Sequence, residues 1–256
     1  MSDWNPEAYA RFHGLRLRPA LDLLEQVGRL PKGDVIDLGC GSGAVGPALA
    51  ARFEDRRIIG IDTSPAMLSE AAATGAYKRC EAADIATWHP ARPPALIFSN
   101  AALHWLPDHA ALMPRLAALL PPGGVLAVQM PRQHDAPSHR LLRAIAAEMF
   151  PDRFDFSLWK PPVMAAPDYA RLLAALGRAE VWESEYTQRL AAEASAHPVR
   201  IFTQSTAMRP MAEKLGPAEQ AAFVARYEAE LELAYPAEAD GSVLMPFRRL
   251  FFVLTV

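Results

Sequence analysis

The hydrophobic pattern of this chain alternates between short apolar runs and longer segments with helical spacing. Apolar runs of this length, bounded by turn residues, are typical of buried strands. The predicted strands are Val35–Leu38, Ile58–Asp62, Lys78–Ala83, Ala95–Ser99 and Val125–Met130. The predicted helices before and between them lie at 18–28, 43–53, 65–74 and 109–120. This alternation predicts an α/β fold with a doubly wound, mainly parallel sheet of the Rossmann-like type.

The pattern changes after Pro131. Further helices are predicted at 138–149, 167–176 and 217–234, and two more apolar or alternating runs, Glu180–Leu190 and Leu250–Val256, predict strands. No standard βαβ unit joins these two strands to each other, so we expect them to pair antiparallel at one edge of the sheet. The sequence therefore predicts a seven-stranded sheet with an antiparallel edge and a helical cap over the active site.

A glycine-rich loop follows the first predicted strand. The segment from Asp37 to Gly43 reads Asp-Leu-Gly-Cys-Gly-Ser-Gly, and a second acid, Asp62, ends the next predicted strand. Glycines permit positive φ and let the backbone approach a ligand closely. A carboxylate at each strand tip beside such a loop is typical of a nucleoside-bearing cofactor site at the carboxyl ends of a parallel sheet.

The glycines alone are compatible with two cofactors, because Gly39, Gly41 and Ala44 also fit the dinucleotide pattern. Three observations favour S-adenosylmethionine over NAD. Asp37 directly before the loop suits an ammonium and a sulfonium, whereas a pyrophosphate needs unopposed N–H donors. Asp84 follows the third strand, where it can accept from an adenine amino group. Finally, the chain offers one wound unit rather than two mononucleotide-binding halves.

The predicted cofactor contacts follow from this choice. Asp62 is expected to accept hydrogen bonds from both ribose hydroxyls, and Met67 to pack on the adenine or in the core. The full predicted set is Asp37, Gly39, Gly41, Gly43, Asp62, Thr63, Met67, Asp84, Ile85 and Asn100.

Net charge, cysteine content and the length of the apolar runs argue against several classes of protein. The net charge of −3 argues against nucleic-acid binding, which usually needs a basic excess. Cys40 and Cys80 are the only cysteines and lack metal-site spacing, so no metal is expected. No apolar run has the length of a bilayer span, and no signal peptide is evident. We therefore expect a cytoplasmic protein with no membrane or obligate protein partner.

Several motifs along the chain resemble one family. They are Trp4-Asn5-Pro6 with Tyr9, Arg16-Leu17-Arg18-Pro19, the segment Ser99–His109, Gln129-Met130-Pro131, Tyr235-Pro236, Asp240-Gly241 and Pro246–Phe251. Together with the glycine loop, the chain resembles class I S-adenosylmethionine-dependent methyltransferases, specifically the trans-aconitate 2-methyltransferase family. It departs from that family at His104, where many relatives carry Gln, and in the segment Phe202–Thr206.

The resemblance implies formation of a methyl ester on a small polycarboxylic acid, with trans-aconitate the first acid to test. Such carboxylates are ionised at neutral pH, so no general base is required and positioning supplies most of the catalysis. Arginine forks match carboxylates, although each arginine can equally serve a structural ion pair. The predicted substrate-binding residues are Arg16, Arg18, Tyr186, Arg209, Tyr235, Arg248 and Arg249.

Two residues are predicted to lie at the reacting centre. Trp105 is placed where a wall of the methyl-transfer site would be, and His104 is a substrate ligand, a base for a hydroxyl acceptor, or a plain loop histidine. The alternatives are a carrier-bound malonyl or hydroxyl acceptor, a non-catalytic S-adenosylmethionine-binding protein, and an NAD-dependent oxidoreductase. The predicted organisation is an N-terminal helical segment contributing to the active site (1–30), a cofactor-binding core (31–135) and a helical cap with the last strands (136–256).

Overall fold

The computed structural model describes the backbone of residues 13–256 and the side chains from Leu17 onward. Trp4, Asn5, Pro6, Tyr9 and the side chain of Arg16 lie outside that part. The chain divides into two compact units. The first holds the described residues up to Pro131 together with Pro162–Ser184 and Arg249–Val256, and the second holds Arg132–Pro161 and Glu185–Arg248.

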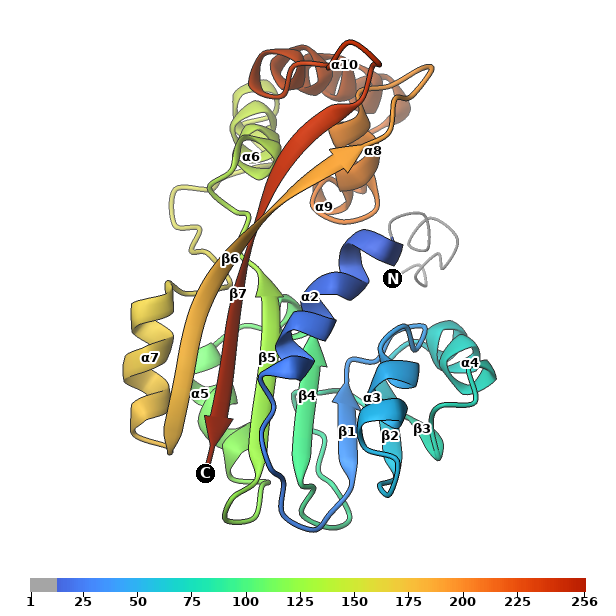
Figure 1. The fold of residues 1–256 in the computed structure, drawn as a ribbon. Helices are drawn as coiled ribbons and strands as arrows, with labels where there is room; N and C mark the ends of the chain where they lie inside the picture. Colours follow the sequence, from blue (N-terminus) through green and yellow to red (C-terminus); the bar gives the residue numbers. More distant parts are fainter. Residues whose placement is uncertain (1–12) are drawn as a thin grey trace. The chain divides into compact units, whose positions relative to one another are not determined.

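A seven-stranded sheet with the strand order β3-β2-β1-β4-β5-β7-β6 organises the fold (Figure 1). The strands are β1 Val35–Leu38, β2 Ile58–Asp62, β3 Arg79–Ala82, β4 Leu96–Asn100, β5 Val125–Pro131, β6 Arg178–Leu190 and β7 Val243–Thr255. The first five strands pair in parallel, and β7 runs antiparallel to β5. The mainly parallel sheet with an antiparallel edge is therefore confirmed.

Burial explains why most strands were predictable. The residues of β1 are all buried, as are those of β2 and β4 before their last residue, as expected for parallel strands covered on both faces. The last strand differs, because β7 begins at Val243 instead of the predicted Leu250. Its first half alternates buried and exposed residues, so only its second half forms a continuous apolar run.

The helices of the first unit cover both faces of its sheet. They are α2 His13–Glu25, α3 Gly46–Arg52, α4 Pro65–Ala73, α5 His109–Ala117 and α7 Ala166–Ala174, with the short 3-10 helix η1 Leu103–Trp105. Figure 1 shows α2 in front of the sheet and α5 behind it. Behind the sheet, Leu116 of α5 and Tyr169 of α7 join one buried cluster with alternate strand residues such as Ile97 and Leu126.

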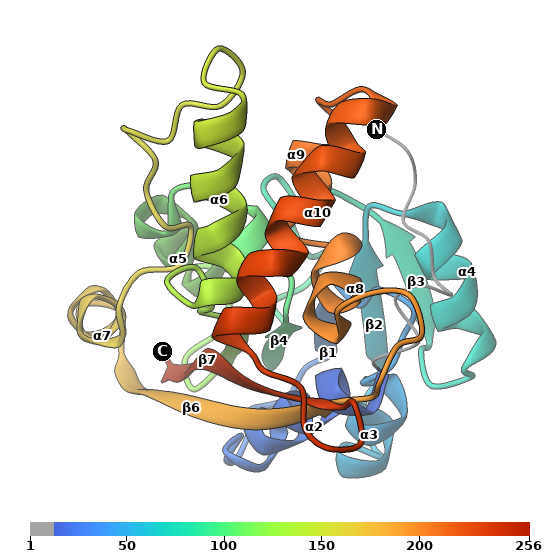
Figure 2. The same cartoon turned by 90° about the horizontal axis from the view of Figure 1, so that it is seen from above.

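The second unit is built around α6 Pro137–Met149, α8 Pro198–Gln204, α9 Arg209–Ala212 and α10 Pro217–Ala234. Figure 2 shows α6 and α10 side by side, in agreement with their direct contacts. The Tyr227 hydroxyl donates to the Ser138 carbonyl over 2.7 Å, which links α10 to the start of α6. The helices α8 and α9 were not predicted from the sequence.

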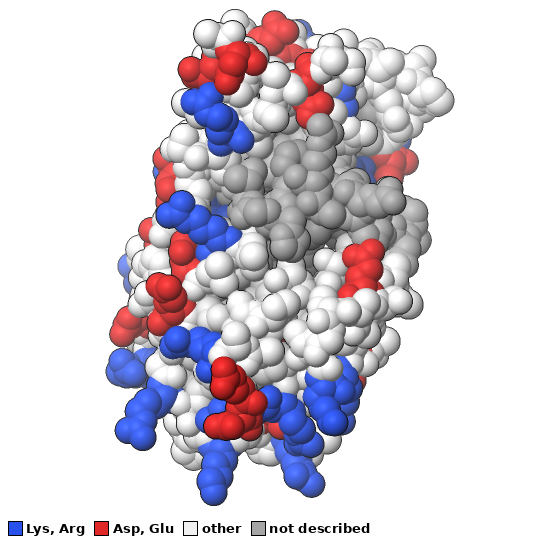
Figure 3. Space-filling view, turned by 45° about the vertical axis from the view of Figure 1, so that its right-hand side comes forward, with Lys and Arg blue, Asp and Glu red and all other residues white. Residues whose placement is uncertain are grey.

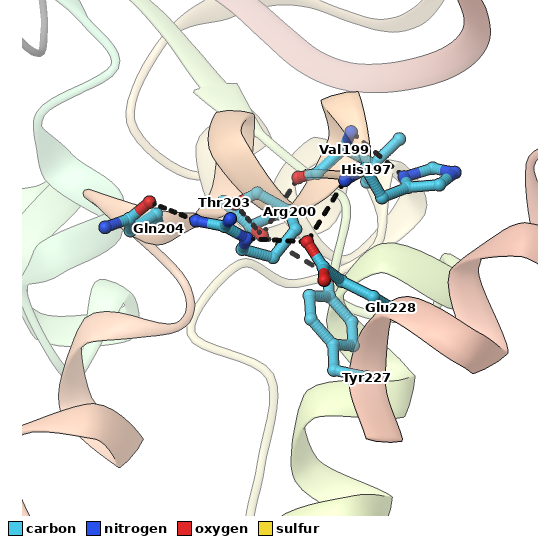
Figure 4. A network of polar contacts seen from close by, with 7 residues as sticks. All are labelled: His197, Val199, Arg200, Thr203, Gln204, Tyr227 and Glu228. Atoms are coloured by element: carbon cyan, nitrogen blue, oxygen red, sulfur yellow. Dashed lines mark hydrogen bonds and ion pairs between the residues drawn. The ribbon is translucent and has the colours of Figure 1, made fainter. Parts of the chain in front are cut away.

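A polar network fixes α8 against α10 (Figure 4). Arg200 Nε donates to Glu228 Oε1 over 2.9 Å, and the buried Thr203 hydroxyl lies 3.3 Å from that of Tyr227. Phe202, also buried, packs edge-on against Phe247. The segment Phe202–Thr206 thus supplies core residues of the second unit. This is the segment in which the sequence differs from the family that the chain resembles.

Candidate functional site

The glycine loop after β1 adopts the backbone that its sequence predicts. Gly39, Gly41 and Gly43 have φ angles of 79°, 52° and 82°, in the region that favours glycine. A Cβ at Gly39 would lie 2.2 Å from the Ala102 Cβ, and one at Gly43 would lie 2.7 Å from the Ala71 Cα. A Cβ at Gly41 would meet no atom within 4 Å. The loop is therefore closely packed on both sides of an open position at Gly41.

The Asp62 carboxylate is held in place by this loop. Its Oδ2 accepts from the Gly41 backbone N–H over 2.9 Å, and its Oδ1 accepts from the Ser64 N–H over 2.9 Å. Each carboxylate oxygen can accept further hydrogen bonds. The half-buried side chain is thus oriented in advance, with acceptor capacity left for two hydroxyls of a ligand.

Asp37 lies deeper than the other acids of the site. Only 2% of it is exposed, and its Oδ2 accepts from the Tyr77 hydroxyl over 2.7 Å. Burial raises the pKa of Asp37 to about 7, with the Tyr77 hydrogen bond opposing and the charge of Asp62 adding to the rise. The contact of Asp37 with a ligand ammonium stays a prediction. Its partner Tyr77 was missed, because nothing in its loop sequence marks it as a partner of β1.

The remaining residues predicted for the cofactor differ in their burial. Met67 is buried in the first turn of α4, and Ile85 packs against the main core cluster. Thr63 and Asp84 are exposed, and Asp84 Oδ1 accepts from the Ala86 N–H over 2.8 Å, which is a local turn contact. At the end of β4, the Oδ1 of Asn100 is buried and has no hydrogen-bond partner among the described residues.

A second group of polar side chains lies where β4, β5 and β7 meet. Arg249 is only 3% exposed, and its Nη1 donates to the Gln129 Oε1 over 3.3 Å. Gln129 is fully buried, and its Nε2 has no hydrogen-bond partner within the described part of the chain. Gln129 was not among the predicted site residues. Its position within the motif Gln129-Met130-Pro131 was the available signal.

Strand register places these groups on one face of the sheet. Asn100 is paired with Gln129, and Arg249 is two residues from Phe251, the partner of Gln129. Asp37 is paired with Phe98, two residues before Asn100. Because side chains two residues apart in a strand point to the same face, Asp37, Asn100, Gln129 and Arg249 all share the face covered by α2.

The residues predicted for the reacting centre lie in η1, directly after β4. The rings of His104 and Trp105 have centroids 4.7 Å apart, and 52% of Trp105 is exposed. Buried His109 holds this turn in place. Its Nε2 lies 2.9 Å from the Leu103 carbonyl oxygen, and its Nδ1 contacts the Tyr169 hydroxyl. Burial lowers the pKa of His109, so this neutral side chain fixes the position of η1.

Among the other predicted substrate residues, Arg18 and Arg209 have local partners of their own. In α2, Arg18 is exposed and lies 4.0 Å from Asp22. Arg209 in the second unit donates from its Nε to Glu213 over 2.8 Å. Tyr186 lies half-buried in β6. Each of these positions leaves the predicted role in acid binding untested.

Arg248 and Tyr235 line a cavity of about 540 Å³ within the second unit. Arg248 lies 3.5 Å from Glu185, and the Tyr235 hydroxyl accepts from the Ser138 N–H over 3.1 Å. Arg132 adds a second cation to the lining, whereas Glu185, Asp135 and Glu238 add three acids. The acids outnumber the cations, so this cavity is a poorer match for a polycarboxylate than the group around Arg249.

The charged surface and the helices complete the description. In Figure 3, basic and acidic side chains are intermixed on the face shown, unlike the continuous basic stripe typical of nucleic-acid-binding proteins. Among the helices that the structure describes, none combines the length and apolar character needed to cross a bilayer.

Comparisons with known proteins agree with this geometry. A family model described as a methyltransferase domain matches residues 9–179. The trans-aconitate 2-methyltransferase of Methylobacterium nodulans is 43% identical over 99% of this chain and 98% of its own length. The trans-aconitate 2-methyltransferase of Escherichia coli strain ATCC 8739 is 40% identical over 99% of this chain and 98% of its own length.

One solved structure shows the shared fold. The phosphoethanolamine N-methyltransferase 2 of Haemonchus contortus, bound to phosphomonomethylethanolamine and S-adenosylhomocysteine, aligns with a TM-score of 0.52. It is 15% identical, and the alignment covers 93% of this chain and 52% of that one. With relatives at 40–43% identity along nearly its whole length, this chain belongs to the trans-aconitate 2-methyltransferase family of methyltransferases.

Proposed function

We propose that this methyltransferase transfers a methyl group from S-adenosylmethionine to one carboxylate of a small polycarboxylic acid, with trans-aconitate as the leading substrate. Its relatives are named trans-aconitate 2-methyltransferases, which supports trans-aconitate as the acid. The observation that carries the proposal is the buried Arg249–Gln129 pair at the carboxyl ends of the central strands.

The residues around the glycine loop fit S-adenosylmethionine. The open position at Gly41 leaves room for the methionine part of the cofactor. Asp62, already oriented by two backbone N–H groups, offers its remaining lone pairs to ribose hydroxyls. The buried carboxyl of Asp37 offers a negative charge to the ammonium. When bound, S-adenosylmethionine supplies an electrophilic methyl group on a sulfonium sulfur.

The Arg249–Gln129 pair fits a carboxylate. A guanidinium presents parallel N–H donors that match two carboxylate oxygens. The unsatisfied Nε2 of Gln129 adds a donor beside it, and an unsatisfied buried donor is costly until a ligand accepts its hydrogen bond. Gln129 also holds the guanidinium through its Oε1, so the donors are positioned before the acid arrives.

The chain's own contribution to the reaction is positional. The acceptor carboxylate is already ionised at neutral pH, so no residue needs to remove a proton from it. Arg249 and Gln129 bind and orient the acid, and Asp62 with the glycine loop orients the methyl donor. Trp105, on the anchored η1 turn, provides an apolar surface that limits water around the reacting groups. Such positioning of two reactants can account for most of the rate enhancement.

The direct test is methylation of a panel of acids with S-adenosylmethionine carrying a labelled methyl group. The panel contains trans-aconitate, cis-aconitate, citrate, a monocarboxylate and a hydroxylated compound without a carboxyl group. We expect label in an ester of trans-aconitate, identified by mass spectrometry and by its loss in mild alkali. Label in the hydroxylated compound alone, as an alkali-stable ether, would overturn the proposal. A cytoplasmic location stays a prediction.

A further inference from the structure

Tyr77 occupies the space beneath the glycine loop. A Cβ at Gly46 would lie 2.5 Å from its Cε2, and a Cβ at Gly43 would lie 3.0 Å from the same atom. A Cβ at Gly60 would lie 3.1 Å from its Cδ1. The ring therefore packs against the loop, the start of α3 and the middle of β2, at three positions where only glycine leaves room.

The hydroxyl of Tyr77 connects this packing to the buried acid. It donates to Asp37 Oδ2 over 2.7 Å, between residues 40 positions apart in the sequence. Asp37 lies opposite Gly60 in the β1–β2 register, so the ring that fills the space at Gly60 also reaches the carboxylate. One side chain thus contacts both the loop and its acid.

From this geometry we propose that Tyr77 is a positioning residue for cofactor binding, which acts by orienting the Asp37 carboxylate beneath the glycine loop. The inference rests on the proposed role of that loop in holding S-adenosylmethionine. Tyr77 itself does not need to touch the cofactor. A hydrogen bond to the ionised form of a buried carboxyl stabilises the charge, and that charge is the one offered to the cofactor ammonium.

Two influences favour the neutral form of Asp37, and the Tyr77 hydrogen bond favours the charged form. Burial and the nearby Asp62 charge raise the pKa of Asp37, and the Tyr77 hydrogen bond lowers it. The thiols of Cys40 and Cys80 interact with Asp37, and their own pKa values are raised, chiefly by burial. They therefore stay neutral near pH 7, and the Tyr77 hydroxyl is the group on which the carboxylate charge depends.

The test is calorimetric binding of S-adenosylhomocysteine, which retains the ammonium, to the wild-type protein and to Tyr77→Phe between about pH 5.5 and 8. Phe keeps the ring packing and removes only the hydroxyl. We expect the wild-type affinity to rise with pH as Asp37 ionises. In Tyr77→Phe the rise should move up by about one pH unit, with roughly fivefold weaker binding near pH 7 and close to tenfold weaker binding near pH 5.5.

Two further variants separate positioning from general stability. Tyr227→Phe removes another buried hydroxyl, bonded to Ser138 in the second unit, and should leave the pH profile of binding unchanged. In an Asp37→Asn background, Tyr77→Phe should have little additional effect on affinity. A Tyr77→Phe profile identical to the wild type, or a loss that is uniform across pH, would overturn the inference. Failure of the wild type to bind S-adenosylhomocysteine would instead overturn the proposed function.

Discussion

The two ends of the candidate site are built in different ways. At β1 and β2, the Asp62 carboxylate is held by backbone N–H groups 21 and 2 residues away in the sequence. At β5 and β7, the Arg249–Gln129 contact joins two side chains 120 residues apart. The Asp62 carboxylate has hydrogen-bond partners in its own loop, whereas the Nε2 of Gln129 has no partner among the described residues. The proposed cofactor site is therefore built mainly from contacts local in the sequence, and the proposed acid site depends on the tertiary fold.

The strongest test of the local end is Asp62→Ala. Loss of two charge-assisted hydrogen bonds, at roughly 1.5–3 kcal/mol each, should weaken S-adenosylmethionine binding on the order of a thousandfold. The dissociation constant is measured by calorimetry. Asp168→Ala is the matched control, because Asp168 is an exposed acid of α7 that pairs with Arg171, and we expect less than about a threefold change. Equal losses in both variants would contradict the assignment of Asp62.

The distant end is tested by Arg249→Met, which keeps the apolar stem and removes the guanidinium. We expect the KM for trans-aconitate to rise about a hundredfold, as for loss of a buried charged hydrogen bond, with cofactor affinity nearly unchanged. Steady-state kinetics and calorimetry measure the two quantities separately.

Arg248→Met is the neighbouring control for that variant. Arg248 is half-exposed and lies 3.5 Å from Glu185, so we expect its removal to raise KM only about twofold to threefold. A larger effect at Arg248 than at Arg249 would place the acid site in the cavity of the second unit and would confirm the role that the sequence predicts for Arg248.

A further expected effect concerns the stability of the protein and the ionisation of Asp37. Its folded pKa of about 7 lies above the ordinary value of 3.8, so the folded state holds the proton more tightly than the unfolded one. The free energy of unfolding should therefore fall as pH rises from about 4 to about 7. Asp37→Asn removes this penalty and should stabilise the ligand-free protein by up to about 4 kcal/mol at pH 8.

Chemical denaturation at several pH values checks this prediction. The difference between Asp37→Asn and the wild type should be near zero at about pH 4 and reach its maximum above about pH 7. A difference that does not vary with pH would show that packing, not ionisation, is responsible. The same variant should bind S-adenosylmethionine more weakly, since it lacks the charge proposed for the ammonium.

Sequence patterns predicted the local end well. The bounds of β1 and β2 agree with the structure, because strands covered on both faces give unbroken apolar runs. The glycine loop was predictable because its backbone angles exclude most other residues. Asp84, predicted for the same end, is exposed, and its contact with the cofactor stays a prediction, since its place after a strand does not specify where its side chain points.

The contact between Gln129 and Arg249, at the β5 and β7 end of the site, was harder to predict from the sequence. Gln129 interrupts an apolar strand like any buried polar residue, and only the β5–β7 register brings it beside Arg249. Among seven predicted substrate residues, no local pattern separates buried Arg249 from exposed Arg248. Tyr77 belongs to a loop, and its contact with Asp37 depends on the space left by glycines from three different elements.

The order of strands in the sheet also has a consequence for synthesis of the chain. The ribosome makes Gln129 120 residues before Arg249, an interval of roughly 6–24 seconds at about 5–20 residues per second. During that interval β5 lacks the neighbour that completes its hydrogen bonds, and β6 has already been made. Until β7 is made, the growing chain therefore has an open strand edge at β5, of the kind that can pair with another chain. The addition of β7 then covers this edge and completes the proposed acid-binding end.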